Sequence, residues 1–254
     1  MPEIEFTSSL AIATVLLSLR LAPVFSFAPP FTLLKTPLIL RVLLGVSISF
    51  WAVLTYPELT IDRVPTGGAI LFVIMSELLF GIILALPLQW AGAAIYMTGR
   101  AVDIQAGFGL ALLADPTTRS QIPLMGTILI YCAGVIFFAI GGGQDLLIIF
   151  NESLKRIPLG AFTGPDGFQT LIMYISIVLS MAIGLIGMTL LTLFLIDMTV
   201  AFLSRTLPQM NVLLIGFQVK TMAVLLTLPI AISFSTALFI RIIRLALRQT
   251  LELV

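Results

Sequence analysis

The stretch GRAVDIQAGFGLALLADPTTRSQIP, residues 99–123, decides the fold of this chain. It separates two long apolar segments, and its own middle is apolar too, whereas a solvated connector would be polar. Arg100 and Asp103 lie three residues apart, on one face of a helix that continues through them, so we expect them to form an ion pair. Asp115 followed by Pro116 is typical of a helix start, with a side-chain acceptor at the N-cap and proline at the first helical position. The stretch therefore predicts a helix, a glycine-hinged apolar loop and a second helix.

Composition indicates an integral membrane protein. Hydrophobic residues make up 59% of the sequence, charged residues only 10%, and the mean hydropathy is +1.17. Several apolar runs exceed the ~20 residues that a helical membrane span needs. The sequence has no histidine, and Cys132 is its only cysteine, which excludes a disulfide within the chain and ordinary His/Cys metal sites. We predict an all-α integral membrane protein of long, broken helical hairpins.

About six apolar stretches can be drawn along the chain. Their approximate bounds are 8–28, 38–57, 69–98, 122–141, 168–203 and 212–240. The third and fifth are too long for simple spans, because about 30 residues at ~1.5 Å each exceed a hydrocarbon core of ~30 Å. We therefore expect these helices to be kinked, broken or partly outside lipid. Lysine and arginine divide evenly between the two sides of a six-span drawing, so the positive-inside rule leaves its orientation open.

Charged residues lie inside these apolar stretches, where lipid disfavours them. Glu77 is one example. Arg20 is another, and it should either face protein or water, or extend its side chain to the membrane surface. The carboxylates are scattered singly, and no serine lies in a nucleophile-elbow arrangement, so the sequence does not predict an enzyme.

The most polar segment of the chain is 142–167, between the fourth and fifth apolar stretches. Its centre is polar enough to lie in water, and we expect it to be helical. It is interpreted as a surface connector within a single domain, 1–254. The connector joins two approximate halves of that domain, 1–141 and 168–254.

A second informative stretch is DMTVAFLSRTLPQMNVLLIGFQVK, residues 197–220. Two apolar helices should meet at a turn, 204–211, because Pro208 ends any helix near it. Asp197 and Lys220 lie on opposite arms, so an antiparallel hairpin would bring them near each other. The turn is either a charged tip among lipid headgroups or a protein contact, since exposed amides beside a methionine suit an adaptable surface. The residues of this contact turn are Arg205, Pro208, Gln209, Met210 and Asn211.

The motif VDIQAGFGLALLADP at 102–116, together with residues 197–220, resembles the FliR family of type III secretion export-apparatus proteins. The resemblance extends to RLAPVF at 20–25 and IPLG at 157–160, and so spans the whole chain. Its most specific part is Ser-Arg, then Pro-Gln-Met-Asn, then a lysine nine residues beyond Asn211. Injectisome homologues share the architecture, but the Pro-Gln-Met-Asn spelling is closer to the flagellar branch.

The resemblance implies a structural, channel-forming subunit of the flagellar export gate, at the basal body in the bacterial inner membrane. It implies FliP-like and FliQ-like partners, FlhB-like and FlhA-like neighbours, unfolded flagellar export substrates and surrounding lipid, but no nucleic acid. The N-terminal part would be FliP-like and the C-terminal hairpin FliQ-like, and neither cofactor nor metal is needed. A loop of such a subunit plugs the channel, and the matching residues here are Gly107, Phe108, Gly109, Leu110, Leu112 and Leu113.

A secondary transporter for a small solute or ion is the alternative. It would use Glu77, Asp103 and Asp197 as ion sites, with broken helices near the middle of the membrane. The two halves should then show an internal repeat, and none is visible in the sequence. A membrane-embedded enzyme is a third class, weakened because no pair of acid-base groups falls on one helical face.

Overall fold

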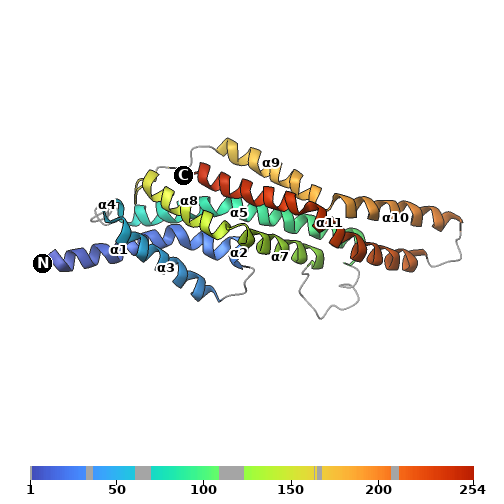
Figure 1. The fold of residues 1–254 in the computed structure, drawn as a ribbon, viewed down its shortest axis with the longest axis horizontal. Coiled ribbons are helices and arrows are strands. Elements are labelled where there is room, and N and C mark those ends of the chain that lie inside the picture. The colour runs from blue at the N-terminus through green and yellow to red at the C-terminus, as the bar shows by residue number, and fades with distance from the viewer. Residues whose placement is uncertain are drawn as a thin grey trace. The chain divides into compact units, whose positions relative to one another are not determined.

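The computed structural model describes residues 2–32, 37–60, 70–108, 123–162, 164, 168–206 and 212–254. All regular structure within these ranges is helical (Figure 1). The helices are α1 (Pro2–Phe27), α2 (Pro29–Thr32), α3 (Leu38–Thr55), α4 (Pro57–Thr60), α5 (Ile70–Ala106), α7 (Leu124–Ala139), α8 (Gly142–Arg156), α9 (Phe168–Leu185), α10 (Gly187–Thr206) and α11 (Val212–Glu252). The all-α fold predicted from the sequence is confirmed.

Membrane-spanning helices dominate the described part of the chain. Five helices are long and apolar enough to cross a membrane, and the bent pair of α7 and α8 raises the number to six if it forms one span. α5 has 37 residues and α11 has 41. At ~1.5 Å per residue, both are longer than a hydrocarbon core of ~30 Å. The chain is a multi-pass membrane protein in which parts of these two helices extend beyond a perpendicular span.

The two overlong stretches differ in how they are built. The third is one continuous helix, α5, with Pro87 inside it. The hydroxyl of Tyr174 donates a hydrogen bond of 2.6 Å to the carbonyl oxygen of Pro87. The fifth stretch is divided by a turn at Ile186 into α9 and α10. Ser235 of α11 donates to the carbonyl oxygen of Leu185 at 2.9 Å, which satisfies one of the groups left unpaired where α9 ends.

The last helix is longer than the apolar stretch that predicted it. α11 continues past residue 240 to Glu252. Arg241, Arg244 and Arg248 are exposed along this extension, and Ile242 and Ala246 are buried. The sequence changes here from uniformly apolar to amphipathic. The apolar stretch therefore ends before the helix does.

The chain forms two compact units. The first unit comprises residues 1–91, 137–175 and 243–254, and the second comprises 92–136 and 176–242. Each unit draws on both halves of the sequence. The assignment of one domain with a central connector stays a prediction.

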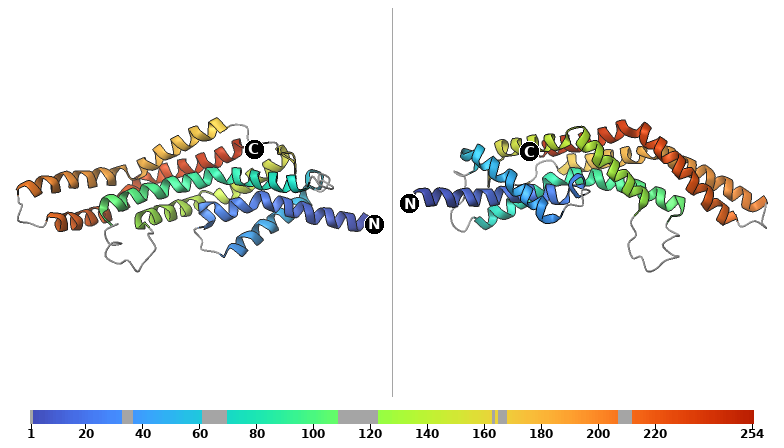
Figure 2. Two further views of the ribbon diagram at one scale, coloured as in Figure 1. Left: turned by 180° about the vertical axis from the view of Figure 1, so that it is seen from behind. Right: turned by 60° about the horizontal axis from the view of Figure 1, so that its bottom comes forward.

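The first unit has a core built from α1, α3, α5 and α8. α1 packs against α3, and the two helices lie side by side in both views of Figure 2. The core holds apolar side chains from all four helices and from the segment after α8. They are Ala13, Leu16, Leu17, Leu21, Phe25, Ala52, Val53, Val73, Phe150, Leu154 and Leu159.

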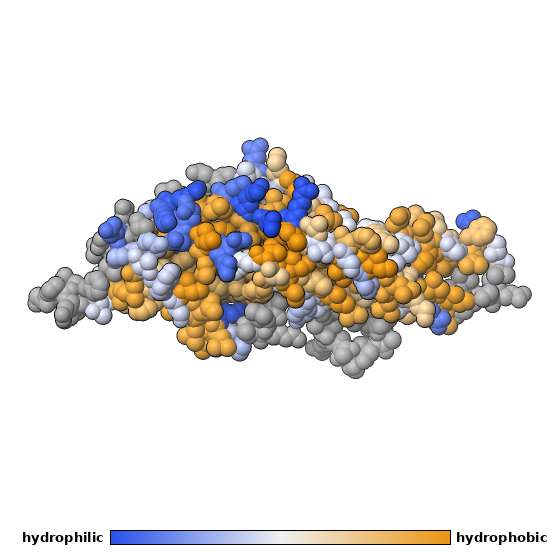
Figure 3. Space-filling view, in the orientation of Figure 1, coloured by the Kyte–Doolittle hydropathy of each residue, from blue (hydrophilic) through white to orange (hydrophobic). Residues whose placement is uncertain are grey.

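In the second unit, α10 and the first half of α11 form an antiparallel hairpin (Figure 1). Large apolar side chains are exposed along both arms. They include Leu191, Phe194, Leu195, Met198, Phe202, Leu214, Met222, Leu225, Leu226 and Ile230. Figure 3 shows orange, apolar residues over much of this hairpin. Apolar faces of this size border lipid or other protein.

Three consecutive glycines lie at the 68° bend between α7 and α8. Gly141 has a φ of +82°, in the left-handed region that favours glycine. A Cβ atom on Gly142 would lie 2.5 Å from the ring of Phe137, which is buried. A Cβ atom on Gly143 would meet nothing within 4 Å. The first two glycines are therefore required by the bend, and the third is not.

This difference predicts opposite effects for two similar substitutions. Gly141→Ala should destabilise the protein by about 1–2 kcal/mol, because alanine is strained in the left-handed region. Gly143→Ala should be neutral or stabilising by up to about 1 kcal/mol, since alanine favours the helix. Denaturant unfolding of the purified protein in detergent measures both. Equal destabilisation by the two changes would contradict this account of the bend.

Candidate functional site

Arg20 and Glu77 form a buried ion pair in the first unit. The Nε of Arg20 donates to Oε2 of Glu77 at 2.7 Å, and its Nη2 donates to Oε1 at 3.0 Å. Both side chains are 0% exposed, so Arg20 faces protein and does not extend to the membrane surface. Its guanidinium carbon lies 4.8 Å from the centroid of the Phe80 ring, which stacks on Phe162. The pair is two-pronged, the geometry in which arginine binds carboxylate most strongly.

The remaining hydrogen bonds of this pair go to the end of α8 and the segment after it. The Nη1 of Arg20 donates to the carbonyl oxygens of Ser153 at 3.2 Å and Ile157 at 3.0 Å. Glu77 accepts a further bond of 2.9 Å from the backbone N–H of Gly160. Carbonyl groups at a helix C-terminus lack partners within the helix, and a cation there is favourable. One ion pair thus connects α1, α5 and α8.

Two glycines allow these elements to approach each other. Gly81 lies one helical turn after Glu77, and a Cβ atom there would overlap the carbonyl oxygen of Arg20. Gly160 has a φ of +77°, which glycine adopts without strain. The backbones of α1 and α5 therefore cross closely at the pair, and the segment after α8 turns back to donate to Glu77.

Asp103 fixes the start of α7 in the second unit. Its carboxylate accepts hydrogen bonds from the backbone N–H of Met125, at 3.1 Å to each oxygen, and of Gly126 at 3.4 Å. The first N–H groups of a helix have no partner within it, and a negative charge there is favourable. A Cβ atom on Gly126 would lie 2.8 Å from the carbonyl oxygen of Tyr96, so α5 and α7 cross closely.

The sequence predicted an ion pair between Arg100 and Asp103, and the structure does not form it. Arg100 is exposed, whereas Asp103 is buried against the start of α7. Among the described residues, neither side chain takes part in an ion pair. Backbone N–H groups from beyond the apolar loop satisfy the carboxylate in place of the nearby arginine.

Gly107 ends α5 with a defined cap. Its φ is +84°, and its N–H donates to the carbonyl oxygen of Ile104 at 3.1 Å. The N–H of Phe108 donates to the carbonyl oxygen of Asp103 at 3.0 Å. These two bonds make a Schellman motif, the usual way in which a glycine terminates a helix. Gly107 therefore fixes the point at which the apolar stretch leaves the helix.

Lys220 connects the α10–α11 hairpin to the end of α5. Its ammonium group donates to the carbonyl oxygen of Gln105 at 3.2 Å, and it forms an ion pair with Asp197. Asp197 lies on α10 and Lys220 on α11, as the hairpin predicted from the sequence requires. A lysine beside the last carbonyl groups of a helix satisfies them and interacts favourably with the helix dipole.

Most of the predicted plug loop and contact turn fall on residues 109–122 and 207–211, outside the described residues. Of the plug loop, Gly107 and Phe108 are described, and both are half-buried. Of the contact turn, Arg205 is described, and it is exposed in the last turn of α10.

A model of the family described as "Bacterial export proteins, family 1" matches residues 11–246. The chain belongs to this family. The export protein is 29% identical to the flagellar biosynthetic protein FliR of Aquifex aeolicus (strain VF5), over 89% of each chain. It is 26% identical to FliR of Escherichia coli (strain K12), over 87% of this chain and 81% of that protein. It is also 26% identical to the surface presentation of antigens protein SpaR of Salmonella typhimurium (strain LT2), over 91% of this chain and 86% of that protein.

The resemblance to the FliR family is thereby confirmed. The relatives include flagellar proteins and proteins named for secretion and translocation. The export protein is a component of a type III secretion export apparatus, and the family consists of export components rather than enzymes.

Sequence reasoning singled out Arg20 and Glu77 but did not pair them, and it missed Ser153 as a partner. A pair that joins distant segments leaves no spacing signal in the sequence. The available hints were local: a glycine one turn after Glu77, and the IPLG segment at 157–160. Both prove to be parts of the same site.

Removing one charge of the buried pair should be far more costly than removing an exposed one. Glu77→Gln should destabilise the export protein by about 3–5 kcal/mol, because Arg20 keeps a buried charge without a counter-charge. Arg20→Met with Glu77→Leu should cost less than the two single changes summed. The matched control is the exposed pair Arg156–Glu152, at 2.9 Å, whose loss should cost about 0.3–0.5 kcal/mol.

Denaturant unfolding in detergent measures both double-mutant cycles. A coupling energy for Arg20 and Glu77 as small as that of the exposed pair would contradict the assigned role.

Asp103 should act as a helix cap and not as the partner of Arg100. Asp103→Ala should destabilise the protein by about 0.5–2 kcal/mol, and Asp103→Asn by less, because the amide oxygen still accepts. Arg100→Ala should add independently to Asp103→Ala. The same unfolding assay measures the coupling energy between the two positions. A coupling energy above about 0.5 kcal/mol would show that Arg100 and Asp103 do interact.

Proposed function

We propose that the export protein is a channel-forming subunit of the flagellar type III protein export gate, at the basal body in the bacterial inner membrane. It assembles with FliP-like and FliQ-like subunits, beside FlhB-like and FlhA-like proteins, and passes unfolded flagellar substrates. Family membership over residues 11–246 and the flagellar names of its relatives support this. The exposed apolar hairpin suits a chain that is stable among neighbouring subunits.

The plug of this channel is proposed to be the apolar loop 107–114. The observation that carries the proposal is an uncharged stretch between two fixed helix ends, the cap at Gly107 and the start of α7 held by Asp103. An apolar segment in a water-filled path excludes ions by filling it and by dewetting. Each large apolar side chain contributes about 1.5–3 kcal/mol on burial. A passing substrate can offset that amount with its own contacts.

The turn 204–211 is proposed as a contact for partner subunits and incoming substrate on the cytoplasmic side. Arg205 is exposed at the end of α10. The ion pair between Asp197 and Lys220 joins the two arms that carry the turn. The amides and the methionine of the turn suit an adaptable protein surface.

A secondary transporter is disfavoured by the partners of its three candidate carboxylates. Glu77 binds Arg20 and the N–H of Gly160, and Asp103 binds the start of α7. Asp197 pairs with Lys220. At least one oxygen of each carboxylate is engaged by the protein itself, which leaves fewer oxygens to coordinate a transported ion.

Deleting residues 109–114, which leaves the cap at Gly107 and Phe108 in place, tests the plug in the assembled complex. Cells that carry the deletion should leak ions or small solutes and grow slowly, while the complex is recovered at its normal level. Replacing the same residues by a serine-glycine segment of equal length is the control for loop length, and it should leak as well, because the apolar fill is gone. Membrane conductance and complex recovery are measured on the same cells. Loss of the complex without any leak would instead make the loop a static packing element.

A further inference from the structure

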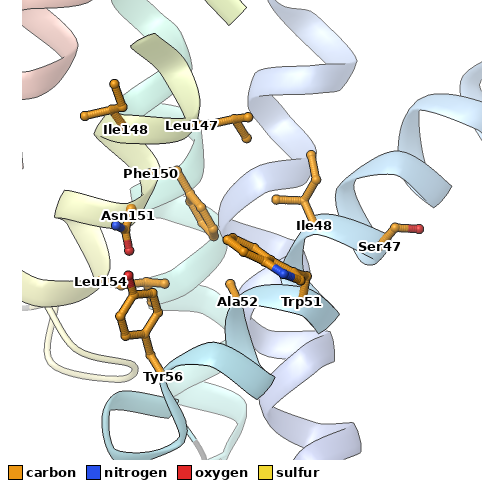
Figure 4. A pocket seen from close by; sticks show the side chains of 10 residues that line it. All are labelled: Ser47, Ile48, Trp51, Ala52, Tyr56, Leu147, Ile148, Phe150, Asn151 and Leu154. Atoms are coloured by element: carbon orange, nitrogen blue, oxygen red, sulfur yellow. The ribbon is translucent and has the colours of Figure 1, made fainter. Parts of the chain in front are cut away.

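A pocket of about 410 Å³ lies between α3 and α8 in the first unit (Figure 4). Its volume is in the usual range of ligand sites, roughly 300–1,000 Å³. The walls are largely hydrocarbon, from Ile48, Ala52, Leu147, Phe150 and Leu154. Among the described residues of the plug and the contact turn, namely Gly107, Phe108 and Arg205, none lines it.

The walls determine what chemistry the pocket accepts. Water needs two to four polar partners in a cavity, and apolar cavities of about 150 Å³ stay dry and take up apolar molecules instead. The volume between α3 and α8 is larger than that and equally apolar in most of its lining. The pocket is open at exposed Trp51 and Ile148, and its mostly apolar lining favours a hydrocarbon occupant over water.

Polar side chains lie at one part of this pocket. Figure 4 shows Asn151 and Tyr56 pointing toward each other beside it. The Oδ1 atom of Asn151 is buried and has no hydrogen-bond partner within the described residues. A buried acceptor without a donor is costly, so the occupant should carry a hydroxyl or ammonium donor next to its hydrocarbon part. Lys155 lies one turn further along α8, exposed, and is in no ion pair of the described residues.

The surroundings of the pocket are those of a membrane surface. α3 is apolar enough to span a bilayer. Trp51 lines the pocket close to the C-terminal end of α3, and its side chain is 65% exposed. Tryptophan and tyrosine gather where the bilayer meets water. α8 bends by 68° away from α7 and exposes both polar side chains near its ends and the aliphatic Leu147 and Ile148, as a helix at a membrane surface does. Lipid is thus the nearest source of hydrocarbon.

We infer that this pocket binds one acyl chain of a membrane glycerophospholipid, with its headgroup donor on Asn151 and its phosphate beside Lys155. Such a lipid supplies hydrocarbon, a donor and a negative charge in one molecule. A helix of a partner subunit would have to bring a side-chain donor to the same place, because its backbone N–H groups are already bonded within the helix. The inference goes beyond the proposed function and does not depend on it.

The test fills the pocket from its exposed edge. Ser47 and Leu147 line it from α3 and α8, and both are exposed, so Ser47→Phe and Leu147→Phe block it without entering the core. Val46→Phe is the matched control, an exposed position on α3 that does not line the pocket. The assembled complex is placed in bilayers of phosphatidylethanolamine and phosphatidylglycerol and extracted into detergent. Native mass spectrometry then counts the retained phospholipid.

The wild-type protein and Val46→Phe should each retain one phospholipid per export protein, and the two blocking variants at least fivefold less. Equal retention in the blocking variants and the control would overturn the inference. A cross-link from Ser47→Cys, in a Cys132→Ala background, to another subunit would also overturn the inference. Such a result would mean that the pocket is a protein contact. Lys155→Ala should reduce the share of retained phosphatidylglycerol, and an unchanged share would remove the phosphate contact. Export is not measured here, so a failure of this inference is distinct from a failure of the proposed function.

Discussion

The buried pair of Arg20 and Glu77 is the constraint on which the first unit depends. Two charges removed from water are strongly destabilising unless each finds its counter-charge and its hydrogen bonds. Here the pair connects three helices, because the guanidinium also binds the carbonyl oxygens of Ser153 in α8 and of Ile157 just after it. The carboxylate also binds the N–H of Gly160. The close crossing at Gly81 and the turn at Gly160 allow the pair to form these contacts. An apolar core alone would pack these helices without specifying where along their lengths they cross.

The second unit uses the same principle at helix ends. Asp103 satisfies N–H groups at the start of α7, and Lys220 satisfies a carbonyl group at the end of α5. Both charged side chains come from outside the helix that they cap. They hold the two ends that flank the apolar loop, together with the cap at Gly107. The two helix ends that flank the proposed plug loop are therefore both fixed by described residues.

Hydrophobic patterning was sufficient for the fold class, because long uncharged runs have few alternatives to membrane helices. It also identified the hairpin whose arms carry Asp197 and Lys220. Hydrophobic patterning did not show which overlong stretch stays one helix and which one breaks. The third stays a single helix, α5, through Pro87, whereas the fifth breaks at Ile186. Helical spacing suggested Arg100 as the partner of Asp103, but a helix start from beyond the loop satisfies that carboxylate. Local sequence patterns do not reveal which distant residues become hydrogen-bond or ion-pair partners once the chain folds.

The central claim is that an export substrate passes this protein beside the apolar loop. Site-specific cross-linking from Phe108→Cys, in a Cys132→Ala background, to an export substrate stalled in the assembled complex tests it most directly. Leu43→Cys on the exposed face of α3 serves as the comparison. The account predicts a cross-link to the substrate from position 108 and none from position 43. A stalled substrate that cross-links to neither position, or to position 43 alone, would contradict it.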